Sequence, residues 1–232
     1  MLLSSNKILV VCAHADDEVL GCGGTLAKAV SLGSEVKVMF LGEGVSARFE
    51  SSELNSDRFK SSTNIRNAEM HAALKFLGVE LYSIGSRLCT QFDRYPLLEF
   101  VKEIEAAIFD FSPDVILTHN DSEVNIDHGV VYRAVEVACR PIDERKRLSV
   151  YSFEIICSGN FKFVDTYSPN VYVDIENYWD AKMGAWSCYK GEARSFPFPR
   201  STVGLETQAR YRGMQCGVRL AEAFRLERIL IS

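Results

Sequence analysis

The chain has 232 residues, a formal net charge of −5, 47% hydrophobic residues and 25% charged residues. This balance is typical of a globular protein with one sizeable core. The sequence has no block of basic residues, so we do not expect nucleic acid as a partner. No signal-peptide pattern and no stretch long enough to span a membrane is visible, so we expect a cytoplasmic protein. The seven cysteines are scattered without a CxxC pair, which favours buried, reduced thiols over disulfides or thiolate metal ligands.

The first third of the chain predicts strands and helices in alternation. An apolar run at 7–13 is typical of a strand buried on both faces, and a helix is expected at 23–32, before a second strand at 35–41. Residues 45–63 are polar and rich in serine, which predicts a long loop. A helix is then expected at 64–77, with one apolar face made up of Ile65, Ala68, Ala72 and Phe76.

The rest of the chain continues this alternation in one α/β domain. Helices are expected at 97–111, 128–139, 178–189 and 205–226, the last with a possible break near Gly213 or Gly217. Strands are expected at 79–84, 113–119, 148–155 and 170–175, the last of them antiparallel at a sheet edge. We therefore predict a single domain with a mostly parallel sheet that is flanked by helices.

Two of the predicted strands end in clusters of ionisable side chains. The strand at 7–13 runs into the cluster 14–18, and the strand at 113–119 runs into the cluster 119–128. Because all strands of a parallel sheet point the same way, both clusters should lie at the same edge, where open α/β sheets bind their ligands. Residues more than a hundred positions apart are thereby expected in one site.

The combined clusters hold the side chains of a catalytic metal site. His14 and Asp17 lie three residues apart on the turn that leaves the first strand, and His128 could supply a third ligand. Two imidazoles and a carboxylate with an open position are typical of catalytic Zn²⁺, and they also suit Fe²⁺. Taken singly, each residue is more readily explained by a capped turn or a hydrogen-bonded core histidine.

Asp16 is the carboxylate left over beside this predicted metal. It could take the proton of an activated water, which favours the hydrolysis of an amide or ester, although a helix-capping carboxylate is the alternative. Asp127 is a candidate for orienting Asp16 or a ligand, and we expect His119 to support a ligand instead of binding the metal. Glu18 is expected to brace the turn, and the glycines at 21–24 to permit close helix packing.

The sequence AHADDEVLGCGGTLAK, residues 13–28, resembles the AHPDDE signature of the LmbE-like (PIG-L) family of zinc-dependent N-acetyl-sugar deacetylases. The resemblance extends over most of the chain. Further matching segments are Arg66 with Glu69, residues 113–115, 125–128 and 138–141, and the C-terminal pieces 197–201 and 221–224.

This resemblance implies a Rossmann-like fold for residues 1–232, zinc ligands His14, Asp17 and His128, Asp16 as the general base, and removal of acetate from an N-acetylated sugar. Asn125 stands where several members carry a histidine thought to stabilise the oxyanion. An asparagine amide could donate a hydrogen bond there but could not shuttle a proton. Protonated Asp16 is then the simplest donor to the leaving amine.

The sequence indicates the substrate less clearly than it indicates the reaction. Arg66 could bind the substrate or form a surface ion pair, and Arg200 could reach a charged substrate group or the pocket of a neighbouring subunit in a homo-oligomer. The expected substrate is an N-acetylated hexosamine on a nucleotide, lipid or antibiotic scaffold. The alternatives are a hydrolase of another N-acyl or amino-sugar amide and a non-catalytic Rossmann-like binding module, against which the carboxylate of Asp16 argues.

Overall fold

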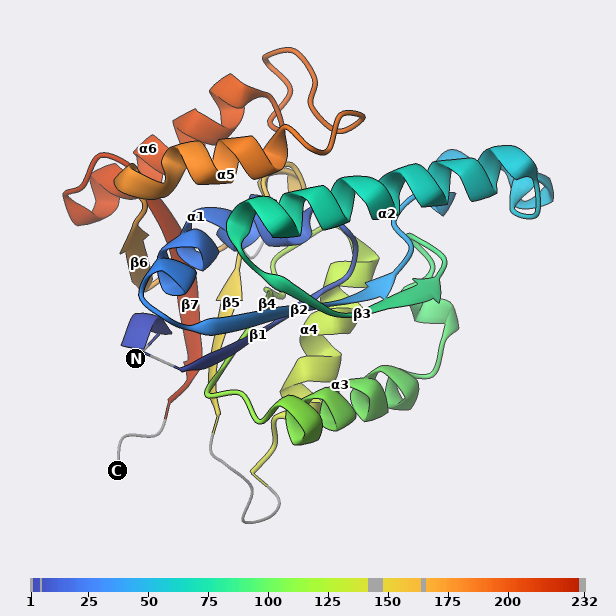
Figure 1. The fold of residues 1–232 in the computed structure, drawn as a ribbon, viewed down its shortest axis with the longest axis horizontal. Helices are drawn as coiled ribbons and strands as arrows, with labels where there is room; N and C mark the ends of the chain where they lie inside the picture. The colour runs from blue at the N-terminus through green and yellow to red at the C-terminus, as the bar shows by residue number, and fades with distance from the viewer. Residues whose placement is uncertain (1, 5, 142–147, 164–165, 230–232) are drawn as a thin grey trace.

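A seven-stranded sheet forms the centre of the molecule in the computed structural model, which describes residues 2–4, 6–141, 148–163 and 166–229. The strand order is β3-β2-β1-β4-β5-β7-β6 (Figure 1). Strands β1 to β5 run parallel, while β7 is antiparallel to both β5 and β6. The strands are β1 (Lys7–Cys12), β2 (Glu35–Gly42), β3 (Glu80–Arg87), β4 (Val115–His119), β5 (Ser149–Phe153), β6 (Val171–Asp174) and β7 (Ala221–Arg228).

Helices cover both faces of this sheet, as Figure 1 shows. The helices are α1 (Asp17–Ser31), α2 (Asp57–Leu77), α3 (Leu97–Phe111), α4 (Ile126–Ala138), α5 (Trp179–Trp186) and α6 (Thr202–Cys216). One core cluster joins α1, α2 and α5 through side chains such as Leu26, Met70 and Ala185. The other joins α3 and α4 through Phe100 and Val131. The predicted mostly parallel α/β sheet flanked by helices is confirmed, and none of the described helices is long and apolar enough to cross a membrane.

Strands β1 and β4 lie side by side, with Ile8 opposite Val115 and Val11 opposite Thr118. Both strands are almost wholly buried, which agrees with their continuous apolar sequences. Their carboxyl ends therefore meet at one edge of the sheet, and the polar clusters that follow them are brought together as predicted.

Helix α1 begins at Asp17, so the predicted start at Gly23 was wrong. The glycines that suggested a turn lie inside the helix, where they permit close packing. A Cβ atom added to Gly21 would lie 2.4 Å from the ring of Phe153, and one added to Gly24 would lie 2.9 Å from Ile175. The interpretation of these glycines as packing residues is confirmed.

Helix α2 begins at Asp57, so the loop predicted at 45–63 is helical in its last part. Ser56 caps the helix by accepting a hydrogen bond from the backbone N–H of Phe59 at 3.1 Å. The predicted apolar face was also wrong, because Ile65 and Phe76 are more than half exposed. The buried face instead consists of Arg66, Met70, Ala73, Leu74 and Leu77. A pattern search that counts only apolar residues misses a face that contains a buried arginine.

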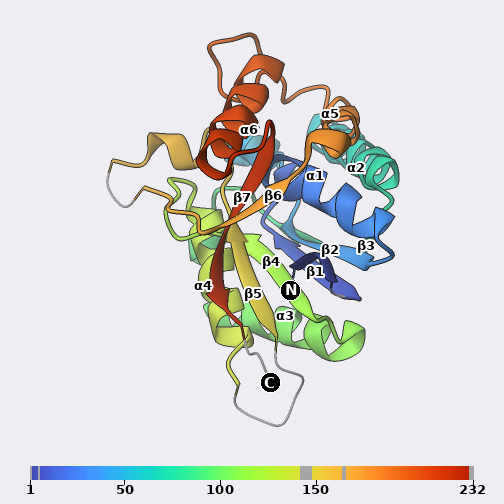
Figure 2. The same ribbon diagram turned by 90° about the vertical axis from the view of Figure 1, so that its left-hand side faces the viewer.

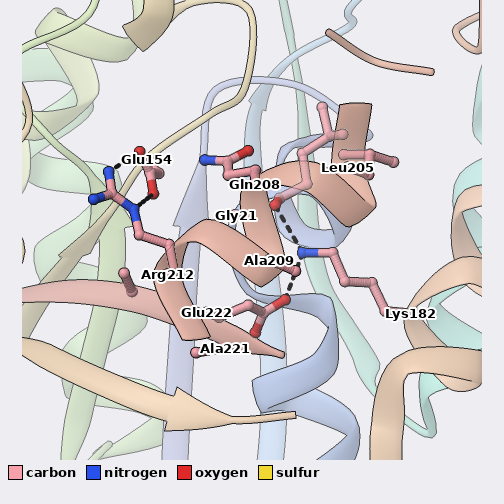
Figure 3. A pocket seen from close by; sticks show the side chains of 11 residues that line it. Gly21, Glu154, Lys182, Leu205, Gln208, Ala209, Arg212, Ala221 and Glu222 are labelled. Atoms are coloured by element: carbon pink, nitrogen blue, oxygen red, sulfur yellow. Dashed lines mark hydrogen bonds and ion pairs between the residues drawn. The ribbon is translucent and has the colours of Figure 1, made fainter. Parts of the chain in front are cut away.

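The predicted C-terminal helix at 205–226 was wrong beyond Cys216. Gly217, with φ 82°, ends α6 in the left-handed conformation, and the chain then returns as β7 between β5 and β6 (Figure 2). The residues of β7 are good helix formers, but pairing with two strands outweighs that preference. Glu222 of β7 binds the ammonium group of Lys182 at 2.6 Å (Figure 3). The same carboxylate accepts the backbone N–H groups of Gly24 and Thr25.

Candidate active site

The turn between β1 and α1 holds its carboxylates apart by hydrogen bonds. The backbone N–H of His14 donates to Asp17 Oδ2 at 2.8 Å, and that of Asp16 donates to Glu18 Oε2 at 3.0 Å. Glu18 is fixed in turn by the hydroxyl of Tyr189 at 2.6 Å. Asp16 has φ 120°, a conformation that costs a non-glycine residue roughly 1–3 kcal/mol. The fold therefore maintains a strained backbone at the residue predicted to be the base, and Glu18 braces the turn as expected.

Three buried side chains form a candidate metal centre at this sheet edge. One ligand atom from each of His14, Asp17 and His128 lies within 4.8 Å of the others. His128 Nε2 is 3.4 Å from Asp17 Oδ1, and His14 Nδ1 is 3.8 Å from Asp17 Oδ2. His128 Nε2 is buried and has no hydrogen-bond partner among the described residues. Two imidazole nitrogens and a carboxylate around one point fit a divalent cation such as Zn²⁺ or Fe²⁺.

Each histidine of this centre is hydrogen-bonded to a further carboxylate through the ring nitrogen that faces away from the centre. Asp127 Oδ2 is 2.8 Å from His14 Nε2, and Glu123 Oε2 bonds to His128 Nδ1. Such carboxylate–histidine pairs fix the ring and its tautomer, which leaves the opposite nitrogen free to bind a metal. The contact between Glu123 and His128 was not predicted from the sequence, although both residues lie in the same polar cluster.

The charges around the two histidines favour positive charge at the centre. Burial lowers the pKa of His128, but Asp17 and Glu123 outweigh that effect and raise it to about 9. Burial likewise lowers the pKa of His14, but the hydrogen bond with the carboxylate of Asp127 outweighs this effect and raises the pKa well above its usual value. The pKa of Asp17 is raised by burial but falls well below its usual value overall because of His128 and His119. A proton on each ring or a divalent cation between them can supply the missing positive charge.

His119 lies behind the centre, and its geometry agrees with a supporting role. Its Nε2 accepts the backbone N–H of Ala13 at 2.9 Å, and its ring stacks on that of His128 with centroids 4.0 Å apart. Burial and the neighbouring His128 lower the pKa of His119, which keeps the ring neutral. Two other groupings of possible ligands, His119–Glu123–His128 and His14–Cys89–Asp127, each use a carboxylate that already bonds an imidazole.

Asp16 lies beside the candidate centre between two guanidinium groups. Arg200 Nη1 is 3.2 Å from Asp16 Oδ2, and Arg66 Nη1 is 3.5 Å from the same oxygen. The side chain of Asp16 makes no capping hydrogen bond to α1, so the helix-cap alternative is wrong. Burial raises the pKa of Asp16, and Arg200 opposes this effect. A carboxylate with a raised pKa beside a metal site is suited to proton transfer.

The two arginines predicted to bind substrate meet at a third carboxylate, that of Glu192. Arg66 is only 2% exposed, so its interpretation as a surface ion pair is wrong. Arg66 Nη2 bonds to Glu192 Oε1, and Arg200 Nη1 is 3.5 Å from Glu192 Oε2. Arg200 thus reaches the site of its own chain. The sequence prediction missed Glu192, which lies in an irregular segment without a motif.

Asn125 is the N-cap of α4. Its side-chain oxygen accepts the backbone N–H of Asp127 at 3.0 Å, and it is half-buried. Because the helix uses the oxygen, the amide nitrogen is the part of Asn125 that can donate to a substrate. This bond also places Asp127 and His128 in the first turn of α4.

The family model described as "PIG-L: GlcNAc-PI de-N-acetylase" matches residues 9–139, which contain both polar clusters. The uncharacterized deacetylase YaiS of Escherichia coli (strain K12) is 31% identical over 199 residues, covering 82% of this chain and 95% of YaiS. The chain belongs to the PIG-L family. The resemblance inferred from the sequence is therefore confirmed, and with it membership of a family of deacetylases.

Other matches to this PIG-L family member are more partial or show only the fold. A 1D-myo-inositol 2-acetamido-2-deoxy-alpha-D-glucopyranoside deacetylase from Mycobacterium avium (strain 104) is 38% identical over 78 residues, 32% of this chain and 25% of that protein. The crystal structure of GalB, the 4-carboxy-2-hydroxymuconate hydratase of Pseudomonas putida KT2440, matches this chain with a TM-score of 0.75 at 20% identity and covers 98% of each chain. A hydratase thus shares this fold, so the reaction has to be inferred from the site.

A cavity of about 210 Å³ opens beside Arg66 in this family member. The segment before α2 and the exposed side of that helix form its walls, which are lined by Val45, Arg48, Phe49, Arg58, Ser62, Ile65, Arg66, Glu69 and Gly191. The guanidinium group of Arg58 lies over the ring of Phe49 at 5.1 Å. An aromatic ring next to hydrogen-bonding side chains is a suitable surface for a polar organic molecule.

Proposed function

We propose that this PIG-L family member is a metal-dependent N-deacetylase that removes acetate from an N-acetylated sugar conjugate. The observation that carries the proposal is the buried group His14, Asp17 and His128, in which His128 Nε2 has no hydrogen-bond partner within the part of the chain that the structure describes. Asp16, with its strained backbone, lies beside this group. The donor set fits Zn²⁺, with Fe²⁺ as the alternative. Zn²⁺ or Fe²⁺ bound there supplies Lewis acidity toward water and the amide carbonyl.

Asp16 carries both proton transfers in this proposal. Its carboxylate takes a proton from the attacking water while the water oxygen forms a bond to the acetamide carbon. The protonated Asp16 then gives that proton to the amine nitrogen, the C–N bond breaks, and acetate and a free amino sugar are released. The half-buried amide of Asn125 donates to the oxyanion formed in between.

Other side chains of the site position these groups. Asp127 and Glu123 hold the imidazoles of His14 and His128 in the orientation that directs one nitrogen of each to the centre. Arg66 and Arg200 hold the carboxylate of Asp16. We also propose that both arginines face polar groups of the bound substrate, since the side chain of Arg200 is 18% exposed.

The proposed substrate is an N-acetylated hexosamine conjugate. A mycobacterial relative with 38% identity over the matched segment is a deacetylase of a 2-acetamido-2-deoxy-glucopyranoside, which supports this substrate class. We propose that the part of the substrate beyond the acetylated sugar, for instance a nucleotide or lipid, lies in the cavity beside Phe49 and Arg58. Cytoplasmic localisation and a homo-oligomeric state stay predictions, to be checked by fractionation and by size-exclusion chromatography.

Acetate release from a panel of N-acylated sugars by the metal-loaded protein tests the proposal. We expect turnover of at least one N-acetylhexosamine conjugate, loss of turnover after chelation, and recovery when Zn²⁺ or Fe²⁺ is restored. Release of another acid in preference to acetate would favour the alternative, a hydrolase of other N-acyl or amino-sugar amides. Metal binding without any hydrolysis would support a non-catalytic binding module and overturn the proposal.

A further inference from the structure

The carboxylate of Glu192 binds guanidinium groups from three separate segments of the chain. Arg48 comes from the 3-10 turn Ser46–Arg48, Arg66 from the middle of α2, and Arg200 from the residues that precede α6. Arg48 and Arg66 bond to Oε1, and Arg200 is 3.5 Å from Oε2. Glu192 itself is 8% exposed and Arg66 is buried as well, whereas the side chain of Arg48 is 51% exposed.

Two of these arginines also contact Asp16, and both contact it through Oδ2. Arg66 divides its donors, because Nη2 bonds to Glu192 while Nη1 faces Asp16 Oδ2 at 3.5 Å and the carbonyl oxygen of Ala15 at 3.1 Å. Arg200 Nη1 lies between Asp16 Oδ2 and Glu192 Oε2, at 3.2 and 3.5 Å. Neither guanidinium therefore forms the two-pronged pair with Asp16 that arginine and carboxylate usually prefer.

We propose that Glu192 is a positioning residue that restricts Arg66 and Arg200 to one oxygen of Asp16 and thereby leaves Oδ1 for the reacting water. The inference rests on the proposed role of Asp16 as base. Without the carboxylate of Glu192, the buried guanidinium of Arg66 loses the partner of Nη2. The carboxylates that remain beside it are Asp16, 3.5 Å from Nη1, and Glu69, 3.9 Å from Nε, so Asp16 is the nearer replacement. A two-pronged pair would then occupy both oxygens of Asp16.

A purely structural role for Glu192 makes a different prediction. Glu192 also links the segment after α5 to α2, and if that were its only task, its loss would lower stability and affect substrate binding and turnover together. A positioning role acts on the reaction step, so kcat should fall while KM changes little. Filling the vacated space with a small carboxylate should restore kcat only if the arginines need an anion there.

The experiment compares metal-loaded Glu192→Gln, Glu192→Asp and Glu192→Ala with the unaltered chain, each with and without added formate. Glu154→Gln is the matched control, because Glu154 forms an ion pair of similar burial with Arg212 of α6. We expect kcat for acetate release to fall by about 10–100-fold in the Gln and Ala variants, with unchanged metal content and KM within about threefold. Formate should restore kcat of Glu192→Ala in a saturable manner, and Asp should retain part of it.

Three results would overturn this inference: an unchanged kcat in the folded Gln variant, a change in KM alone, or no effect of formate on Glu192→Ala. Formate must also leave the unaltered chain and Glu154→Gln without any gain in kcat. If the unaltered chain releases acetate from no substrate, the proposed function itself fails, and this outcome is distinct from a Glu192 variant that stays fully active.

Discussion

The carboxylate of Glu123 should control metal affinity through the tautomer of His128. Its Oε2 bonds to His128 Nδ1, while Oε1 accepts the backbone N–H of Ile155 and the amide of Asn120, both at 2.9 Å. Glu123→Gln can keep the Oε1 contacts, which directs its new NH₂ group at His128 Nδ1. That nitrogen must then accept, so the ring proton moves to Nε2, the nitrogen needed for the metal. We expect metal affinity to fall by about 10–100-fold, or about 1.4–2.7 kcal/mol.

Competition with a chromophoric chelator measures this affinity, and a thermal melt of the apo protein shows that the variant is folded. Glu227→Gln is the matched control, because Glu227 accepts a hydrogen bond from Ser152 Oγ at 2.7 Å and lies outside the candidate centre. The reasoning is refuted if Glu123→Gln binds Zn²⁺ as tightly as the unaltered chain, or if the control loses as much affinity.

Three further predictions concern packing, the buried ion pair and the metal. Gly21→Ala places a Cβ atom 2.4 Å from the ring of Phe153 and should lower the free energy of unfolding in urea by about 1–3 kcal/mol. Gly129→Ala is the control and should lower it by nothing, because a Cβ atom there has nothing within 4 Å. Equal effects of the two substitutions would contradict the packing argument. Glu222→Ala leaves the ammonium of Lys182 buried without its carboxylate and should destabilise by about 3–5 kcal/mol, a loss that Lys182→Met in the same chain should partly recover. Adding Zn²⁺ at a hundred times its Kd should stabilise the chain by about 2.7 kcal/mol, and His128→Ala should abolish this gain in stability. An equal gain in the His128→Ala variant would mean that the metal binds elsewhere.

The location of the site could be predicted because two simple patterns coincide. The apolar strands β1 and β4 each end in a polar cluster, and parallel pairing brings those ends together. His14, Asp17 and His128 therefore meet in the structure at the edge where the sequence predicts them. The roles of these residues stay predictions until activity and metal content are measured.

The parts that could not be predicted depend on contacts distant in sequence. Strand β7 has helix-forming residues and becomes a strand only because β5 and β6 flank it. Helix α2 directs the buried Arg66 toward Asp16, which reverses the apparent apolar face. Glu192 gains its place through arginines at positions 48, 66 and 200, and nothing in its own neighbourhood indicates that cluster.

The measurement that tests the central claim most directly is acetate release and metal content in Asp16→Asn. Since the carboxylate of Asp16 is proposed to move the protons and not to hold the metal, we expect this variant to bind Zn²⁺ with normal stoichiometry. Its kcat should fall by about 10²–10⁴-fold, the usual contribution of a general acid–base residue. Turnover close to that of the unaltered chain, or loss of the metal together with the activity, would contradict the division of roles between Asp16 and its neighbours.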